Sequence, residues 1–190
     1  MSAVQRWGHQ GRRLSRGLQA EVTQMAQSLE SKPMHFLLRV PRLTRIEGYA
    51  ALTINTIDAH SKTIQELGRA AIAKFGKPPP ASTVELLKKQ IMEGKRTYLI
   101  LVVKSAGTRK THLGYQTEIA SIRLGAPTDE IKNSAPTYYR ELGYGAGLWF
   151  TVDAPLAPSD LSRFRLVTNK KPVLDVITKC RTPSMLVEMS

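Results

Sequence analysis

The sequence predicts an α+β fold in which a four-stranded sheet carries two helices on one face. The chain has 190 residues, and 42% of them are hydrophobic, which is enough to bury the core of one ordinary domain. Residues 98–103 form a continuous apolar run of strand length, typical of a central strand. Segments of helical period separate strand-like segments in the order strand, helix, strand, strand, helix, strand.

The first predicted strand covers residues 50–58, where apolar and polar residues alternate. The period then changes, and an amphipathic helix is predicted over residues 61–75. Thr63 and Glu66 have the spacing of a capping box, and Gly76 suits the left-handed cap that ends a helix.

Three consecutive prolines at 78–80 predict an extended stretch after this helix. A shorter helix is expected from about Ser82 to Gly94, as an inserted connection. The central strand follows over residues 97–103, and residues 115–124 are predicted to pair with it. The loop between these two strands is too long for a tight hairpin turn.

The last helix and strand of the predicted domain follow residue 127. Thr128 and Asp129 are suited to open a helix, which Pro136 breaks, so that its productive part is predicted over residues 137–142. Residues 147–152 predict the final strand.

The predicted domain therefore covers residues 49–152. Residues 1–48 precede it as a basic extension that includes a proline-containing linker. Residues 153–190 contain four prolines and are predicted to form a C-terminal wrapping tail with little independent core.

The basic extension has two possible roles. Arg12, Arg13 and Arg16 lie in a segment that has no acidic residue before Glu21. This composition is typical of a mitochondrial transit peptide. A retained arm that contacts RNA is the alternative, and the sequence leaves both open.

The charge balance predicts a polyanionic partner. Lys and Arg total 28 against 15 Asp and Glu, so the formal net charge is +13. Such a field attracts phosphate backbones or anionic lipid. The excess lies in the front two-thirds of the chain, because residues 126–190 carry eight basic and seven acidic residues.

Several other functional classes find no support in the sequence. No apolar run approaches the ~20 residues needed to span a bilayer, so membrane insertion is not expected. Cys180 is the only cysteine, which excludes an internal disulfide framework. The four histidines are scattered and not at ligand spacing, so no metal site is expected. No nucleotide-binding or nucleophile motif is present, so we expect no enzyme activity, cofactor or small-molecule substrate.

The loop after the central strand is the best candidate for binding. It gathers basic residues at one end of two apolar strands, where cations on an adaptable loop suit phosphates. An ordinary solvated loop is the alternative interpretation. The candidate RNA-binding residues are Lys104, Arg109, Lys110 and His112 in this loop, Lys95 and Arg96 at the entrance to the central strand, and Arg12, Arg13 and Arg16 in the extension.

The order of elements and several short motifs of residues 50–152 resemble the small-subunit ribosomal protein family S-ten. In LTINTIDAHSKTIQELGRAAIAKFG, Asp58 and Gly76 stand where that family ends its first strand and its first helix. The proline-rich KPPPAS and the strand YLILVVKS follow, and Lys110 has the spacing of the family's loop lysine. A Pro-Thr step and AGLWFTV match the last helix and strand. The pattern departs from the family at Ala106-Gly107, at His112-Leu113 and in residues 82–94.

This resemblance implies a ferredoxin-like fold and adds Ser105 to the candidate RNA-binding residues. It implies a structural constituent of the mitochondrial ribosome, located in the matrix, that binds rRNA and neighbouring proteins of the small-subunit head. It implies no cofactor. Two alternatives stay open: the related mitochondrial large-subunit family L-forty-eight, and an accessory scaffold subunit of an organellar membrane complex.

Overall fold

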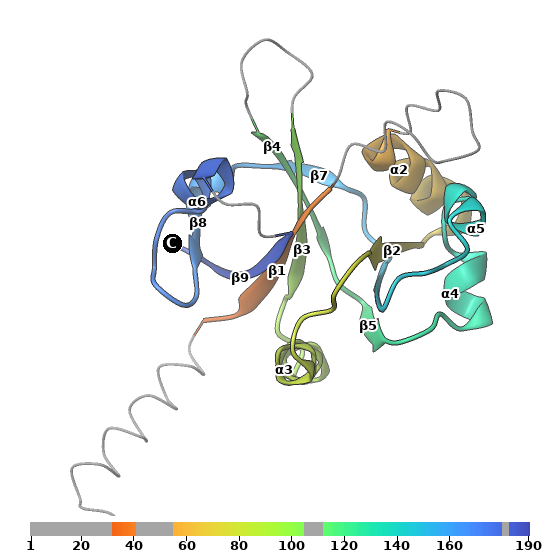
Figure 1. Cartoon of the computed structure of the whole chain (residues 1–190), viewed down its shortest axis with the longest axis horizontal. Helices are drawn as coiled ribbons and strands as arrows, with labels where there is room; N and C mark the ends of the chain where they lie inside the picture. The colour runs from red at the N-terminus through yellow and green to blue at the C-terminus, as the bar shows by residue number, and fades with distance from the viewer. Residues whose placement is uncertain (1–31, 41–54, 105–111, 180–182) are drawn as a thin grey trace, which may run out of the picture. The chain divides into compact units, whose positions relative to one another are not determined.

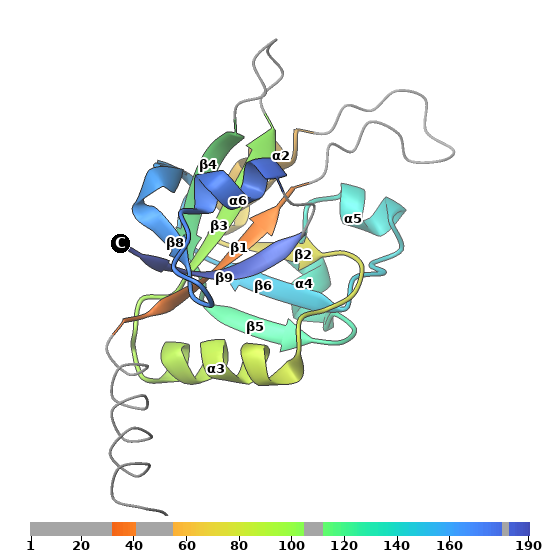
Figure 2. The same ribbon diagram turned by 60° about the vertical axis from the view of Figure 1, so that its left-hand side comes forward.

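The computed structural model describes residues 32–40, 55–104, 112–179 and 183–190. This part of the chain is mixed α+β, as predicted, but it contains two sheets instead of one four-stranded sheet. One sheet has six strands in the order β7-β4-β3-β1-β9-β8, and the other has three in the order β2-β6-β5. Figure 1 shows the two sheets with most of the labels used below, and Figure 2 also labels β6.

The elements follow one another along the described residues as follows. The strands are β1 Met34–Arg39, β2 Ala70–Lys74, β3 Tyr98–Lys104, β4 His112–Glu118, β5 Ser121–Leu124, β6 Leu148–Val152, β7 Ala157–Ser159, β8 Phe164–Leu166 and β9 Ser184–Met189. The helices are α2 Thr56–Leu67, α3 Ala81–Met92, α4 Asp129–Asn133, α5 Tyr138–Glu141, the 3-10 turn Leu161–Arg163 and α6 Val173–Lys179.

The centre of the six-stranded sheet joins segments from distant parts of the chain. Strand β1 is parallel to β3, with Phe36 opposite Leu99, and antiparallel to β9, with Phe36 opposite Leu186. Strand β4 continues the sheet as the antiparallel hairpin partner of β3. Figure 2 shows β9 and β1 side by side between β8 and β3.

Alternate residues of the central strands face two separate cores. Phe36 of β1 and Leu101 of β3 pack between the two sheets, against residues of β2 and β6 such as Ile72 and Phe150. The residues next to them along each strand face the opposite side of the sheet, and one of them, Ile100, packs in the core under α6 and β8. Both strands are therefore buried on both faces, which explains their continuous apolar sequences.

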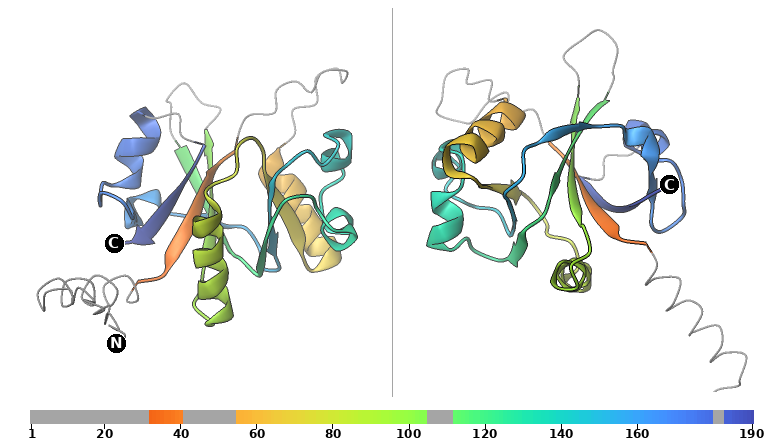
Figure 3. Two further views of the ribbon diagram at one scale, coloured as in Figure 1. Left: turned by 60° about the horizontal axis from the view of Figure 1, so that its bottom comes forward. Right: turned by 180° about the vertical axis from the view of Figure 1, so that it is seen from behind.

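The three-stranded sheet also separates two cores. On its far face, Ala71 and Ala73 of β2 and Trp149 of β6 pack against α4 and α5. Figure 3 shows the resulting layers, with α6 outside the six-stranded sheet and α4 and α5 outside the three-stranded sheet. The small alanines of β2 leave room for the tyrosines of α5, Tyr138 and Tyr139.

The first half of the chain departs most from prediction. The segment MHFLLR, expected to belong to a linker, is β1. The predicted strand over residues 50–58 is wrong in its described part, because Asn55 caps α2 by accepting hydrogen bonds from the N–H groups of Ile57 and Asp58. Residues 50–54 lie outside the described residues.

The helix predicted to reach residue 75 ends much earlier. Gly68, at φ 71°, is the left-handed cap of α2, and residues 70–74 form the buried strand β2. A fully buried strand shows no alternation, so its period does not distinguish it from a buried helical segment, and Ala71 and Ile72 of β2 also fit the apolar face of a longer helix. Thr63 is no cap residue, and its hydroxyl donates to the carbonyl of Ala59 inside α2.

Several predictions are confirmed. Helix α3 lies where residues 82–94 predicted it, although Pro80 and not Ser82 is its N-cap. The central strand β3 and its hairpin partner β4 form as expected. The predicted 115–124 strand, however, divides after Glu118, and β5 joins the second sheet. Thr128 caps α4, Pro136 separates it from α5, and β6 forms where residues 147–152 predicted a strand, although three more strands follow it among the described residues.

The C-terminal segment is not a tail with little core. Residues 153–190 contribute three strands and α6, and β9 lies between β1 and β8. Phe164, Val173, Ile177 and Val187 are all buried in the core under α6. The prolines fall in edge strands and connections, which is where proline is compatible with a sheet.

Candidate functional site

The structure brings together two of the predicted RNA-binding residues. Lys104 ends β3 and His112 begins β4, and the two are directly opposite each other in the antiparallel register. Their side chains therefore lie at the same end of the six-stranded sheet. Ser105, Arg109 and Lys110, between them in sequence, lie outside the described residues, as do Arg12, Arg13 and Arg16.

Lys95 and Arg96 do not belong to this group. They precede β3, whereas Lys104 ends it, and a seven-residue strand separates its two ends by roughly 20 Å. The ammonium group of Lys95 forms an ion pair of 2.9 Å with Glu93 instead. The structure therefore does not bring Lys95 and Arg96 together with Lys104 and His112, and RNA binding by Lys95 and Arg96 stays a prediction.

Arg39 is a basic residue of this site that the sequence did not reveal. It ends β1, where it is opposite Val102 of β3, and it lines the same cavity as Lys104 and His112. Recognition of β1 as a strand parallel to β3 would have placed Arg39 here, because parallel strands end at the same edge. We call Arg39, Lys104 and His112 the basic end.

The positive charges of the basic end act on one another. Burial lowers the pKa of His112, and the charges of Arg39 and Lys104 lower that pKa further. Nearby positive charges favour the neutral form of the His112 imidazole. The basic end is therefore a place where an added anion would relieve repulsion.

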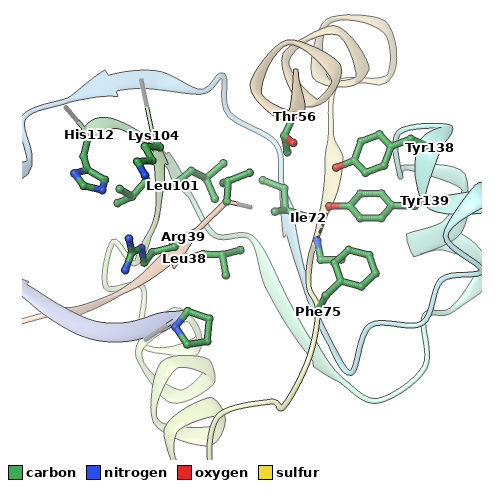
Figure 4. Close-up of a pocket in the computed structure, with 14 residues that line it drawn as sticks. Leu38, Arg39, Thr56, Ile72, Phe75, Leu101, Lys104, His112, Tyr138 and Tyr139 are labelled. Atoms are coloured by element: carbon green, nitrogen blue, oxygen red, sulfur yellow. Dashed lines mark hydrogen bonds between the residues drawn. The ribbon is translucent and has the colours of Figure 1, made fainter. Parts of the chain in front are cut away.

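A cavity of about 510 Å³ opens beside the basic end, between the two sheets. Its floor is aliphatic and consists of Leu38, Ile72 and Leu101. Its far side is an aromatic wall, which consists of Phe75, Tyr138 and Tyr139. Figure 4 shows the basic end on one side of the cavity, the aromatic wall on the other and the aliphatic floor between them.

The aromatic wall is fixed by buried hydrogen bonds. The hydroxyl of Tyr139 accepts the backbone N–H of Ala73 at 3.0 Å and lies 3.2 Å from Nε2 of His60. Nδ1 of His60 lies 2.6 Å from the carbonyl oxygen of Thr56. Because Nδ1 must donate to that carbonyl, Nε2 is the acceptor and Tyr139 donates to it.

The same network closes the edge of β2. The N–H of Ala71 donates to the carbonyl of Ser134 at 2.8 Å, while the N–H of Ala73 donates to Tyr139. Two backbone donors that point away from β6 are thereby satisfied. The edge is covered, as sheet edges in folded proteins usually are.

Burial sets the protonation of these groups. His60 is completely buried, and burial lowers its pKa to about 4, so the imidazole is neutral at pH 7. Burial raises the pKa of Tyr139 to about 12 and raises that of Tyr138 as well. The wall is therefore uncharged, and its hydroxyls act as hydrogen-bonding groups.

Two further properties of the described residues bear on function. They contain no group of three or more His, Cys, Asp or Glu residues placed to hold a metal ion. None of the helices within the described ranges is both long enough and apolar enough to cross a membrane.

Comparisons with family models, curated proteins and solved structures found no match to this chain.

Proposed function

We propose that this protein is an RNA-binding structural component of a ribonucleoprotein particle, and that it docks on RNA phosphates through the basic end. The observation that carries the proposal is the convergence of Arg39, Lys104 and His112 at one end of a six-stranded sheet. The sequence places Arg109 and Lys110 in the connection between Lys104 and His112. Cations held by a rigid base are suited to position a phosphate backbone.

The charge environment supports a polyanionic partner. Within the part of the chain that the structure describes, acidic residues neutralise seven lysines and arginines, but neither Lys104 nor His112 belongs to these pairs. The net charge of +13 adds long-range attraction for RNA. Burial is the main reason why the pKa of His112 is lowered, and the positive charges of Arg39 and Lys104 lower it further.

The narrower proposal is a place in the head of the small subunit of a mitochondrial ribosome. It rests on the resemblance to the S-ten family, and the β3–β4 hairpin with Lys104 at its end supports it, as do the Thr128-capped α4 and the strand β6. The ferredoxin-like arrangement that the resemblance implies has one four-stranded sheet, so the two sheets of six and three strands give that part of the proposal no support. Asp58 and Gly76, expected at the ends of the first strand and the first helix, give no support, because Asp58 lies in α2 and Gly76 follows β2.

The binding proposal is tested by the salt dependence of RNA affinity. Removal of one phosphate-binding cation should reduce the slope of log K against log salt by about 0.7 for a single strand. We expect Lys104→Ala to weaken binding and to reduce this slope. Lys95→Ala is the matched control, because it removes the same charge at the opposite end of β3, and it should leave the slope near that of the unaltered protein.

Equal slopes for the two variants would remove the basic end from the interface. The ribosomal proposal is tested separately, by sedimentation of the tagged protein from organelle lysate on a magnesium-containing gradient. Migration with the small-subunit rRNA supports it. Migration with the large-subunit rRNA favours the L-forty-eight alternative, and absence from both subunits contradicts a ribosomal role.

A further inference from the structure

We infer that the cavity beside the basic end binds one unpaired nucleotide of an RNA strand, with the base in the cavity and its phosphate at the basic end. This inference rests on the proposed RNA-binding function and adds a specific pocket to it. The cavity, of about 510 Å³, lies within the roughly 300–1,000 Å³ range of small-ligand sites. It is therefore large enough to admit a base together with its sugar.

The lining favours a ligand with two different ends. A simple anion at the basic end would leave the aliphatic floor and the aromatic wall empty. A purely apolar ligand would leave the ammonium group of Lys104 without an anionic partner among the described residues and the ligand. A nucleotide supplies both a flat, largely apolar ring and an anion, so it matches the two ends of the cavity (Figure 4).

The polar atoms of the inner side favour a base over an alkyl chain. Thr56 and Tyr138 line the cavity, and the hydroxyl of Tyr138 is hydrogen-bonded to those of Thr56 and Tyr139. A hydroxyl oxygen has two acceptor lone pairs, so these groups can also accept a hydrogen bond from a donor on a base edge, which a hydrocarbon chain does not offer. Phe75 adds an aromatic surface, and bases stack on aromatic side chains in single-stranded RNA sites.

The aromatic wall is rigid before any ligand binds. Phe75 is stacked on Tyr139, with ring centroids 5.8 Å apart and an interplanar angle of 23°. Tyr139 is itself held by Ala73 and His60. A preformed wall of this kind reduces the ordering cost of binding.

The pocket also continues the proposed RNA-binding surface. Lys104 and His112 belong both to the cavity lining and to the β3–β4 hairpin. A strand whose phosphates lie on the hairpin thus has the cavity mouth within reach of its next unpaired base. This continuity selects an RNA nucleotide as the occupant, in preference to a free nucleotide.

The test uses the full-length protein and three probes: a single-stranded oligoribonucleotide, a duplex of the same length, and free nucleoside monophosphate. The single strand carries thiouridine for photo-crosslinking, and the cross-linked peptides are mapped by mass spectrometry. We expect cross-links to peptides that contain Phe75 or Tyr138. We also expect the single strand to bind more tightly than the duplex at equal salt.

Two variants report on the pocket. Thr56→Trp fills the cavity from the first turn of α2, and Phe75→Leu removes the stacking surface while keeping an apolar side chain. Both should weaken single-strand binding about tenfold and leave duplex binding within about twofold. Circular dichroism and thermal unfolding identify any variant that fails to fold. If one variant fails to fold, the RNA affinities of the other variant test the pocket.

The outcomes separate the two proposals. Unchanged single-strand affinity in a folded pocket variant, with cross-links confined to other peptides, overturns the pocket and leaves the RNA-binding proposal intact. No binding of either RNA by the unaltered protein at low salt overturns both. Free nucleotide that binds as tightly as the strand overturns the assignment to RNA and indicates a small-molecule site.

Discussion

The side-chain amide of Gln90 forms both hydrogen bonds of a backbone pair with Met34. Its Oε1 accepts the N–H of Met34 at 2.9 Å, and its Nε2 donates to the carbonyl of Met34 at 2.8 Å. Gln90 is buried, so the side chain of α3 continues the hydrogen bonding of the sheet at the first residue of β1.

Replacing Gln90 by leucine should destabilise the fold. The substitution keeps the apolar contact but leaves the buried N–H and carbonyl of Met34 without partners. Each unsatisfied group costs about 1–3 kcal/mol, so we expect the two together to lower the free energy of unfolding by roughly 2–6 kcal/mol. Urea denaturation measures it. Lys89→Ala, at a neighbouring exposed position, is the control, and an equally small effect of both changes would contradict the role of the amide.

The free energy of unfolding should decrease as the pH is lowered, because two buried histidines become protonated on unfolding. Burial lowers the pKa values of His35 and His60 from 6.5 to about 4. Between these values the unfolded chain binds more protons than the folded chain, so the free energy of unfolding is greatest above pH 6.5 and decreases as the pH drops toward 4. Each histidine contributes about 3 kcal/mol to this loss.

Urea unfolding at a series of pH values tests this expectation. His60→Gln removes one titrating group, and it should flatten the dependence by about half between pH 6.5 and 4. An unchanged slope in that variant would show that His60 is protonated equally in the folded and unfolded chains.

Gly114 is required where β7 joins the six-stranded sheet. A Cβ atom at this position would lie 2.6 Å from the carbonyl oxygen of Ser159 and 2.7 Å from Cδ2 of Leu161. We expect Gly114→Ala to cost about 1–3 kcal/mol through overpacking and to increase amide exchange in β7. Gly145→Ala is the matched control, because its Cβ would meet only the carbonyl oxygen of Leu142 at 3.8 Å. Equal stability of the two variants would show that β7 moves aside freely.

RNA binding should raise the pKa of His112. In the free protein, burial and the charges of Arg39 and Lys104 lower this pKa. A phosphate at the basic end supplies negative charge, which favours the imidazolium. An NMR titration of the histidine ring protons with and without RNA measures the shift. His35 is the internal reference, and a pKa of His112 that stays constant while RNA binds would place the RNA elsewhere.

The sequence predicts the elements that have a strong punctuation signal or a long β-branched and apolar run. Thr128 and Pro136 delimit α4 and α5, and the β-branched run of β3 marks a central strand, so all three could be located. It does not distinguish a short, doubly buried strand from a helix. Residues 70–74 are predicted in the wrong class for that reason, since packing on both faces removes alternation.

The candidate site was predictable only in part. The sequence shows the basic residues at the two ends of the hairpin connection. It does not show that Arg39 belongs with them, because that follows only from the parallel pairing of β1 with β3. A basic residue also need not belong to a surface. Lys74 is 2% exposed, and its ammonium group donates to the carbonyls of Lys77 and Phe75. Charge counting cannot detect such burial, because it depends on tertiary structure.

The pairing of β1 with β9 has a consequence for how the chain acquires its structure during synthesis. Strand β1, near residue 36, pairs with β9, near residue 186, so the centre of the sheet is complete only after β9 has been synthesised. Contacts so distant in sequence slow folding, because a long loop has to close before they form. Until then β1 has an unpaired, strongly apolar edge, which is a typical starting point for aggregation. The nascent chain is thus expected to depend on a chaperone until β9 has been made.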